Sequence, residues 1–244
     1  MSLLHVHGLS KRFGGLMAIA DFSMTLAPGE LLSLIGPNGA GKTTVFDLLS
    51  GFLRPDAGEI HFQGHSLVGL KPHRICQLGL TRTFQLTRPF AHLTVLENVR
   101  VGALARIPAR GEAEAKAWQV LEEIGLTASA HMPAGGLTLA DRKRLELARA
   151  LATEPALFLL DEVMAGLTPP ETERMVELVR RINREGRAVV LIEHVMRAVM
   201  ALSERVLVLS GGHLIAEGPP EAVANDPRVI EVYLGAEYVT TPPG

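Results

Sequence analysis

A glycine-rich segment near residue 40 constrains the fold more than any other part of the chain. It reads Gly36-Pro37-Asn38-Gly39-Ala40-Gly41-Lys42-Thr43-Thr44 and matches the phosphate-binding pattern G-x-x-x-x-G-K-[ST]. The apolar run 31–35 before it is typical of a strand, and residues 45–49 after it show helical spacing. Strand, loop and helix in this order direct backbone N–H groups and a helix N-terminus at a phosphate chain. We expect Lys42 to reach the phosphates and the Thr43 hydroxyl to bind Mg²⁺.

Bulk composition narrows the class of protein. The chain has 244 residues, 47% of them hydrophobic, which is enough for one α/β domain. A net charge of −2 argues against a nucleic-acid or anionic-lipid partner. The single cysteine excludes an internal disulfide and suits a reducing compartment. We find no signal-peptide layout and no apolar run near the ~20 residues of a membrane span, so we expect a cytosolic chain unless a partner holds it at a membrane.

The order of predicted elements indicates an α/β fold. Residues 3–7 and 22–26 read as strands of an N-terminal antiparallel layer, with a turn at 11–15 between them. Buried strands are expected at 156–160 and 188–192, and each is preceded or followed by helical patterns. Alternating strands and helices predict a parallel sheet that is covered on both faces.

A mostly helical stretch interrupts this pattern. We predict helices from about 94, 113 and 138, and we treat 86–153 as a helical subdomain inserted into a catalytic core formed by 1–85 and 154–244. All of 1–244 then forms a single domain. Thr138 and Asp141 fit a capping box, in which the Thr138 side chain accepts from the Asp141 N–H and the carboxylate returns to the Thr138 N–H.

Polar residues follow three of the predicted strands. Asp161 and Glu162 end the strand 156–160, and we expect Asp161 to hold Mg²⁺ and Glu162 to act as general base. An acidic strand end without catalytic function is the alternative, and the phosphate loop upstream disfavours it. His194 follows the strand 188–192 and is expected to contact the γ-phosphate, because parallel strands end at one edge. Gln85 ends a third predicted strand at 80–84, and it is expected to touch Mg²⁺ or the attacking water and to report nucleotide state to the insert.

Aromatic and histidine side chains near the N-terminus have two interpretations each. Phe13 is a candidate to stack on a purine ring, and the alternative is a core aromatic of the antiparallel layer. His5 and His7 share one strand face, but no third ligand accompanies them. We therefore interpret the two histidines as strand surface.

Taken together, these residues resemble the ATP-binding subunit of an ABC transporter, over essentially the whole chain. Along the chain these features come in the order of an aromatic residue, the phosphate loop, a Gln, the signature helix, the acidic pair and a His. Within that superfamily the chain resembles the branched-chain amino-acid uptake group. Six stretches carry this likeness: Lys11-Arg12-Phe13-Gly14-Gly15, Ser50-Gly51-Phe52-Leu53-Arg54-Pro55, Arg82-Thr83-Phe84-Gln85, Thr94-Val95-Leu96-Glu97-Asn98-Val99, Leu191-Ile192-Glu193-His194-Val195-Met196 and Tyr233-Leu234-Gly235.

The resemblance implies a fold and a mechanism. It implies a P-loop NTPase core that uses ATP and Mg²⁺, and two such subunits that close face to face on two ATP molecules. Each nucleotide would lie between one phosphate loop and the other subunit's signature residues, which here are Thr138, Leu139 and Ala140. Two transmembrane permease subunits, and indirectly a substrate-binding protein, are the further partners implied, with the chain at the cytoplasmic face of the inner membrane. No nucleic-acid partner is implied.

The signature departs from the family pattern Leu-Ser-Gly-Gly-Gln. Ala140 adds a Cβ where the family has glycine, and Asp141 places a carboxylate where the family usually has an amide. Val163 stands where the family commonly has a proline. Residues 164–168 replace a loop in which the family usually has an Asp that crosses the dimer. We therefore expect a heterodimer with unequal sites, in preference to a homodimer, in which the site using this chain's signature is slower.

Three other functions compete with amino-acid import. A soluble ABC-type ATPase of repair, translation or cluster assembly is disfavoured by the single cassette, short insert and slightly acidic charge. The ATPase of a lipid exporter remains an alternative. A regulatory subunit without turnover is opposed by Glu162 and His194. Residues 86–90 are a candidate pocket for a permease helix, and simple packing of the insert on the core is the alternative.

Overall fold

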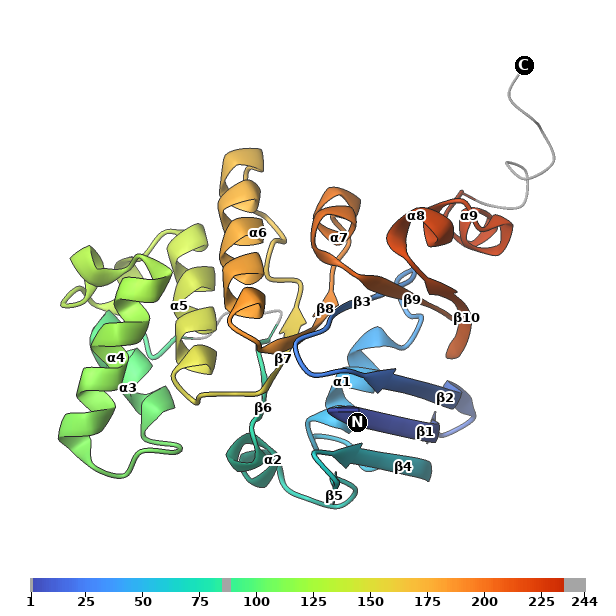
Figure 1. Cartoon of the computed structure of the whole chain (residues 1–244), viewed down its shortest axis with the longest axis horizontal. Coiled ribbons are helices and arrows are strands. Elements are labelled where there is room, and N and C mark those ends of the chain that lie inside the picture. Colours follow the sequence, from blue (N-terminus) through green and yellow to red (C-terminus); the bar gives the residue numbers. More distant parts are fainter. Residues whose placement is uncertain (1, 85–88, 235–244) are drawn as a thin grey trace.

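The computed structural model describes residues 2–84 and 89–234, which form two sheets and the helices around them (Figure 1). The first sheet is antiparallel and four-stranded, in the order β2-β1-β4-β5. Its strands are β1 (Leu4–Phe13), β2 (Leu16–Leu26), β4 (Ala57–Phe62) and β5 (His65–Ser66). The predicted turn at 11–15 is wrong in part, because Lys11 to Phe13 continue β1 and the turn is confined to Gly14 and Gly15. Bulges in the β1–β2 register explain why simple alternation underestimated both strands.

The second sheet has six strands in the order β10-β9-β3-β8-β7-β6. These are β3 (Leu31–Ile35), β6 (Leu80–Arg82), β7 (Leu157–Asp161), β8 (Ala188–Ile192), β9 (Arg205–Ser210) and β10 (His213–Gly218). All pairs are parallel except β9 with β10. Every residue of β3, β7 and β8 is buried, as expected for a sheet covered on both faces. The carboxyl ends of β3, β7 and β8 therefore meet at one edge.

Helices flank the second sheet. They are α1 (Lys42–Leu49), α2 (Pro72–Leu78), α3 (Val95–Ala103), α4 (Arg110–Ile124), α5 (Leu139–Leu151), α6 (Pro169–Arg184), α7 (Met196–Leu202), α8 (Pro220–Ala224) and α9 (Pro227–Leu234). Helices α3, α4 and α5 group at the end of the molecule away from the antiparallel sheet (Figure 1). Within the described parts of the chain, none of these helices combines the length and apolar character needed to span a bilayer.

Alternate residues of β7 point into two separate apolar cores. Phe158 and Leu160 join the core that contains α3, α4, α5 and α6. Leu157 and Leu159 join the core that contains α1 and the antiparallel sheet. This is the period of two expected of a strand buried on both faces. Helices α3, α4 and α5 consequently share one apolar core with a face of the second sheet.

Caps set the starts of several helices. Thr94 begins α3 with a complete capping box, its partner being Glu97, and Thr168 begins α6 in the same way with Glu171. The predicted box at Thr138 is half wrong. The Asp141 N–H donates to the Thr138 side chain at 3.2 Å, but the Asp141 carboxylate accepts from the Thr138 hydroxyl at 3.0 Å instead of from its N–H. That carboxylate is held there by an ion pair with Arg144.

One predicted strand boundary also differs. Residues 80–84 were expected to form a strand that ends at Gln85, whereas β6 ends at Arg82. Gln85 itself, and most of the predicted permease-helix pocket at 86–90, lie outside the described residues.

Candidate active site

Close packing of the backbone requires glycine in the phosphate loop. At Gly36, φ is 151° and a Cβ would lie 2.1 Å from the Leu209 carbonyl oxygen. At Gly41, φ is 107° and a Cβ would lie 2.6 Å from the Ala18 carbonyl oxygen. Since backbone atoms cannot give way cheaply, neither position accepts a side chain. The loop thereby delivers the chain to Lys42, the first residue of α1, whose amino end faces the cleft.

An open cleft of about 490 Å³ lies over this loop. It brings together the loop residues 38–44, Phe13 at the end of β1, and the side chains of Glu162 and His194, which end β7 and β8. Of the predicted loop residues, Gly36 and Pro37 do not line this cleft, and their carbonyl oxygens accept hydrogen bonds from Lys42. Phe13 is 45% exposed, so it is not a core aromatic. Phe13, the loop residues 38–44, Glu162 and His194 thus share one cleft, whereas Asp161 does not line it and Gln85 lies outside the described residues.

Lys42 is folded back onto the loop. Its Nζ donates to the carbonyl oxygens of Gly36 at 2.7 Å and Pro37 at 2.9 Å. Burial lowers the pKa of Lys42, and the negative charges of Glu162 and Asp161 act in the opposite direction. A phosphate oxygen at this place would supply a charged acceptor for the same ammonium group.

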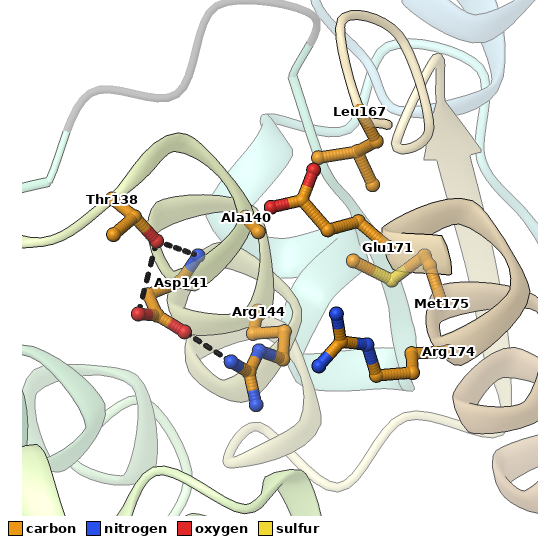
Figure 2. A pocket seen from close by; sticks show the side chains of 8 residues that line it. All are labelled: Thr138, Ala140, Asp141, Arg144, Leu167, Glu171, Arg174 and Met175. Carbon is orange, nitrogen blue, oxygen red and sulfur yellow. Dashed lines mark hydrogen bonds and ion pairs between the residues drawn. The ribbon is translucent and has the colours of Figure 1, made fainter. Parts of the chain in front are cut away.

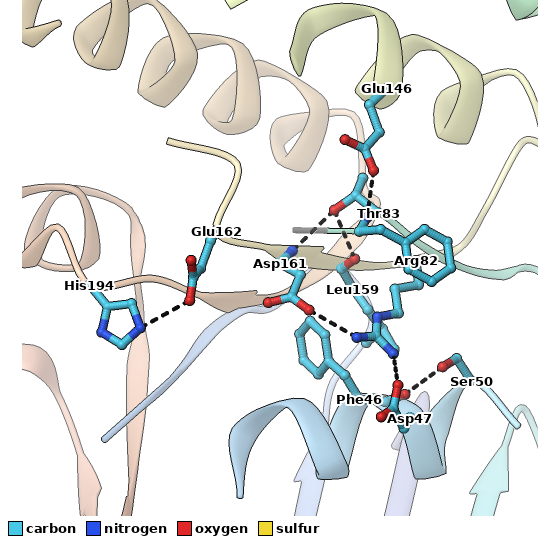
Figure 3. A network of polar contacts seen from close by, with 11 residues as sticks. Phe46, Asp47, Ser50, Arg82, Thr83, Glu146, Leu159, Asp161, Glu162 and His194 are labelled. Atoms are coloured by element: carbon cyan, nitrogen blue, oxygen red, sulfur yellow. Dashed lines mark hydrogen bonds and ion pairs between the residues drawn. The ribbon is translucent and has the colours of Figure 1, made fainter. Parts of the chain in front are cut away.

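Asp161 lies in a network of buried charges (Figure 3). Its Oδ2 accepts from Arg82 Nη2 at 2.9 Å, and Arg82 also pairs with Asp47 on α1. The Asp161 N–H donates to the Thr83 hydroxyl at 3.1 Å, which fixes the end of β7 against β6. Burial raises the pKa of Asp161, while the Arg82 hydrogen bond and charge lower it. Sequence reasoning missed Arg82; a charged residue inside a short buried strand was the available signal.

Glu162 and His194 are in direct contact. His194 Nε2 lies 3.1 Å from Glu162 Oε1, and Figure 3 shows the imidazole beside the carboxylate at the carboxyl edge of the sheet. The Glu162 N–H donates to the Ile192 carbonyl oxygen at 2.9 Å, so β8 holds both residues of the pair. This is the geometry of a carboxylate base oriented by a neighbouring side chain.

The signature residues lie in a different pocket (Figure 2). Thr138, Ala140 and Asp141 line it together with residues of α6 and the loop before it, which are Leu167, Glu171, Arg174 and Met175, and with Arg144 of α5. Leu139 is exposed at the start of α5. Among the described residues, therefore, the phosphate loop and the signature of one chain line two different pockets.

Three further residues near the site were not identified from sequence. Lys143 on α5 and Glu193 at the end of β8 are 6% and 2% exposed, and both contact the segment that carries Glu162. Burial raises the pKa of Tyr233 on α9, and a hydrogen bond from the Gly36 backbone opposes the rise. For Lys143 and Glu193, the signal available in the sequence was a charged residue within an apolar helix or strand pattern.

The histidine pair of β1 behaves as strand surface. His5 and His7 are exposed, and their rings stack with centroids 6.4 Å apart. Within residues 2–84 and 89–234, no group of three or more His, Cys, Asp or Glu side chains is placed to hold a metal. Oxygen donors near a bound phosphate are therefore the candidates for holding a cation.

Comparison with known proteins assigns the family. The family model "ABC transporter" matches residues 19–165, and the model "Branched-chain amino acid ATP-binding cassette transporter" matches residues 213–239. The chain is 43% identical to the high-affinity branched-chain amino acid transport ATP-binding protein LivG of Escherichia coli and 40% identical to BraF of Pseudomonas aeruginosa. Each alignment covers 96% of this chain and 98% of the relative.

Solved structures agree with this assignment. The structure of the ADP conformation of an ATP-binding cassette of an ABC transporter superposes with a TM-score of 0.89 at 30% identity. The alignment covers 96% of this chain and 99% of that one. A nucleotide-free cassette superposes with a TM-score of 0.88 at 29% identity. The predicted P-loop NTPase fold is confirmed, and this chain belongs to the ATP-binding proteins of ABC transporters.

Proposed function

We propose that this chain is the ATP-hydrolysing subunit of an importer for branched-chain amino acids, or for similar small amino acids and amides. The observation that carries the proposal is the cleft in which the phosphate loop meets the Glu162–His194 pair. Near-full-length similarity to proteins named for high-affinity branched-chain amino acid transport supports the substrate class. The chain would act at the cytoplasmic face of the inner membrane, held there by two transmembrane permease subunits.

Phosphate binding is the first task of the site. The N–H groups of residues 38–44 and the amino end of α1 would surround the β- and γ-phosphates. Lys42 would exchange its two carbonyl acceptors for phosphate oxygens. Phe13, exposed at the rim of the same cleft, would stack on the purine ring.

The donor set at this edge fits Mg²⁺. Asp161 supplies a carboxylate and Thr43 a hydroxyl, which are hard oxygen donors of the kind that Mg²⁺ takes beside phosphate oxygens. When bound, the ion would neutralise charge developing on the phosphate oxygens. Gln85 is proposed as a further ligand. Before the ion binds, Arg82 would keep Asp161 ionised and correctly oriented.

Hydrolysis would proceed by attack of water on the γ-phosphorus. Glu162 would accept a proton from that water as its oxygen bonds to phosphorus, and the bond from phosphorus to the bridging oxygen of ADP would break. His194 would hold the Glu162 carboxylate in place, with 3.1 Å between Nε2 and Oε1, and would contact the γ-phosphate. Closure of two subunits would exclude bulk water from this arrangement.

We infer a heterodimer with unequal sites from the signature pocket. The Thr138 hydroxyl has one proton, and it is donated to the Asp141 carboxylate at 3.0 Å. A hydroxyl committed in this way is a poor donor to a partner's γ-phosphate. The Asp141–Arg144 ion pair stabilises that arrangement. The site built from this chain's loop and a partner's signature would therefore be the faster of the two.

Purification from native membranes tests the proposal. The chain would be tagged, recovered after gentle solubilisation, and its partners identified by mass spectrometry. Two polytopic permeases with a second, different ATPase support the importer and the heterodimer. The recovered assembly, in liposomes with a leucine-loaded binding protein, should then take up labelled leucine in an ATP-dependent way. Glu162→Gln should bind ATP but abolish uptake. Soluble partners alone, or a homodimer that moves lipid, would refute the importer.

A further inference from the structure

Helix α5 contacts the core through two side chains one turn apart, Lys143, which is buried, and Glu146, which is half-buried. Lys143 Nζ donates to the carbonyl oxygen of Glu162 at 2.8 Å. Glu146 Oε1 accepts from the N–H of Phe84 at 2.5 Å, just after β6 (Figure 3). One face of α5, the signature helix that Thr138 caps, therefore contacts the ends of two adjacent strands, β7 and β6.

Glu193 joins the two sides of the Glu162–His194 pair. Its Oε1 accepts from the N–H of Met164, two residues after Glu162, at 2.8 Å. Its Oε2 accepts from the N–H of His194 at 3.3 Å. One buried carboxylate thus links the loop after β7 to the residue after β8. Burial raises the pKa of Glu193, and the hydrogen bonds from Met164 and His194 and the charge of Lys143 oppose that rise.

The backbone of Glu162 needs such support. Its φ of 48° lies in the left-handed region, which is unfavourable for a residue with a Cβ. A residue keeps this conformation only when the surrounding structure determines it. Here the N–H of Glu162 is bound to Ile192 and its carbonyl oxygen to Lys143, so both ends of the strained residue are fixed.

From these contacts we propose that Lys143 and Glu193 are positioning residues, which hold the Glu162 carboxylate against His194 and couple its placement to the signature helix. The inference rests on the proposed role of Glu162 as general base. Because Thr138 caps the amino end of α5, any shift of that end moves Lys143 with it. A nucleotide bound at this chain's signature would therefore influence the base that serves its own phosphate loop.

The first test compares Lys143→Met with Lys143→Arg and with Lys71→Met, which replaces an exposed lysine at the start of α2. Lys143→Met should lower the single-turnover rate of ATP hydrolysis about 10- to 100-fold, because a small misplacement of the base is enough. Affinity for a fluorescent ATP analogue should stay within about twofold. Lys143→Arg, which keeps a cationic donor, should recover part of the rate, and Lys71→Met should match the unsubstituted chain.

A double-substitution cycle separates positioning from a general loss of structure. If Lys143 acts through Glu162, adding Lys143→Met to Glu162→Gln should change the residual rate by less than about twofold. Glu193→Gln keeps the shape of the side chain and one hydrogen-bond acceptor, and it should lower the single-turnover rate of ATP hydrolysis. It replaces Lys143→Met as the test variant if Lys143→Met does not fold. A parallel loss of nucleotide affinity and rate, or equal effects of Lys143→Met in both backgrounds, would overturn the inference. A Glu162→Gln variant that hydrolyses normally would overturn the proposed function instead, and with it this role of Lys143.

Discussion

Replacing Arg82 with methionine probes the charge network under the site. Arg82 and Asp161 have side chains only 5% and 4% exposed, with 2.9 Å between Nη2 and Oδ2. The guanidinium also lies 5.5 Å from the ring centre of Phe46 and 5.2 Å from that of Phe84. Methionine preserves much of the apolar stem but leaves the carboxylate of Asp161 buried without its cation.

The expected loss of stability is large for one side chain. Removing one partner of a buried ion pair costs about 3–5 kcal/mol, because the other charge stays buried without compensation. For a chain of this size, that corresponds to a fall in Tm of about 6–20 °C. The control is Arg197→Met, which breaks an exposed pair with Glu173 and should cost at most about 1 kcal/mol.

Urea unfolding of four proteins measures the effect: the unsubstituted chain, Arg82→Met, Asp161→Asn and the double variant. If the uncompensated carboxylate causes the loss, Asp161→Asn should restore part of it, with a coupling energy of about 1–3 kcal/mol. A cost for Arg82→Met no greater than that of Arg197→Met would refute the reasoning. So would a double variant whose loss equals the sum of the two single losses.

Three further substitutions test other parts of the chain. Gly41→Ala should abolish binding of labelled ATP and cost at least about 1 kcal/mol in a urea melt, since its Cβ would lie 2.6 Å from the Ala18 carbonyl oxygen; normal binding would contradict the close approach. Phe13→Ala should leave Tm unchanged, because the ring is exposed, and it should weaken ATP binding about 10-fold in a filter assay. Unchanged affinity would exclude stacking of Phe13 on the purine ring. Hydrogen bonds from the Thr94 N–H and hydroxyl lower the pKa of Glu97. The extra folding stability of the chain over its Glu97→Gln variant is therefore complete above pH 4.5 and is lost as pH falls through the lowered pKa. Urea midpoints at neutral and acidic pH check this, and a pH-independent difference would exclude it.

Local patterns predicted the parts of the fold that depend on local physics. The apolar runs at 156–160 and 188–192 became β7 and β8 because a run of that length, buried on both faces, has few other solutions. The capping box of Thr168 and Glu171 that starts α6 is equally local, since it involves residues only three positions apart. The same reasoning was half wrong at Thr138, where Arg144, one turn further on, competes for the Asp141 carboxylate.

The sequence by itself determined the phosphate loop, the acidic pair and the histidine, because each follows a recognisable strand and the carboxyl ends of parallel strands meet at one edge. It did not determine what surrounds them. Arg82 reaches Asp161 across 79 positions, and Lys143 reaches Glu162 from an inserted helix. Such contacts depend on the order of the strands and on which helix face covers them, and no local spacing encodes either. Only the tertiary structure therefore decided which charges are buried together and how Glu162 is held.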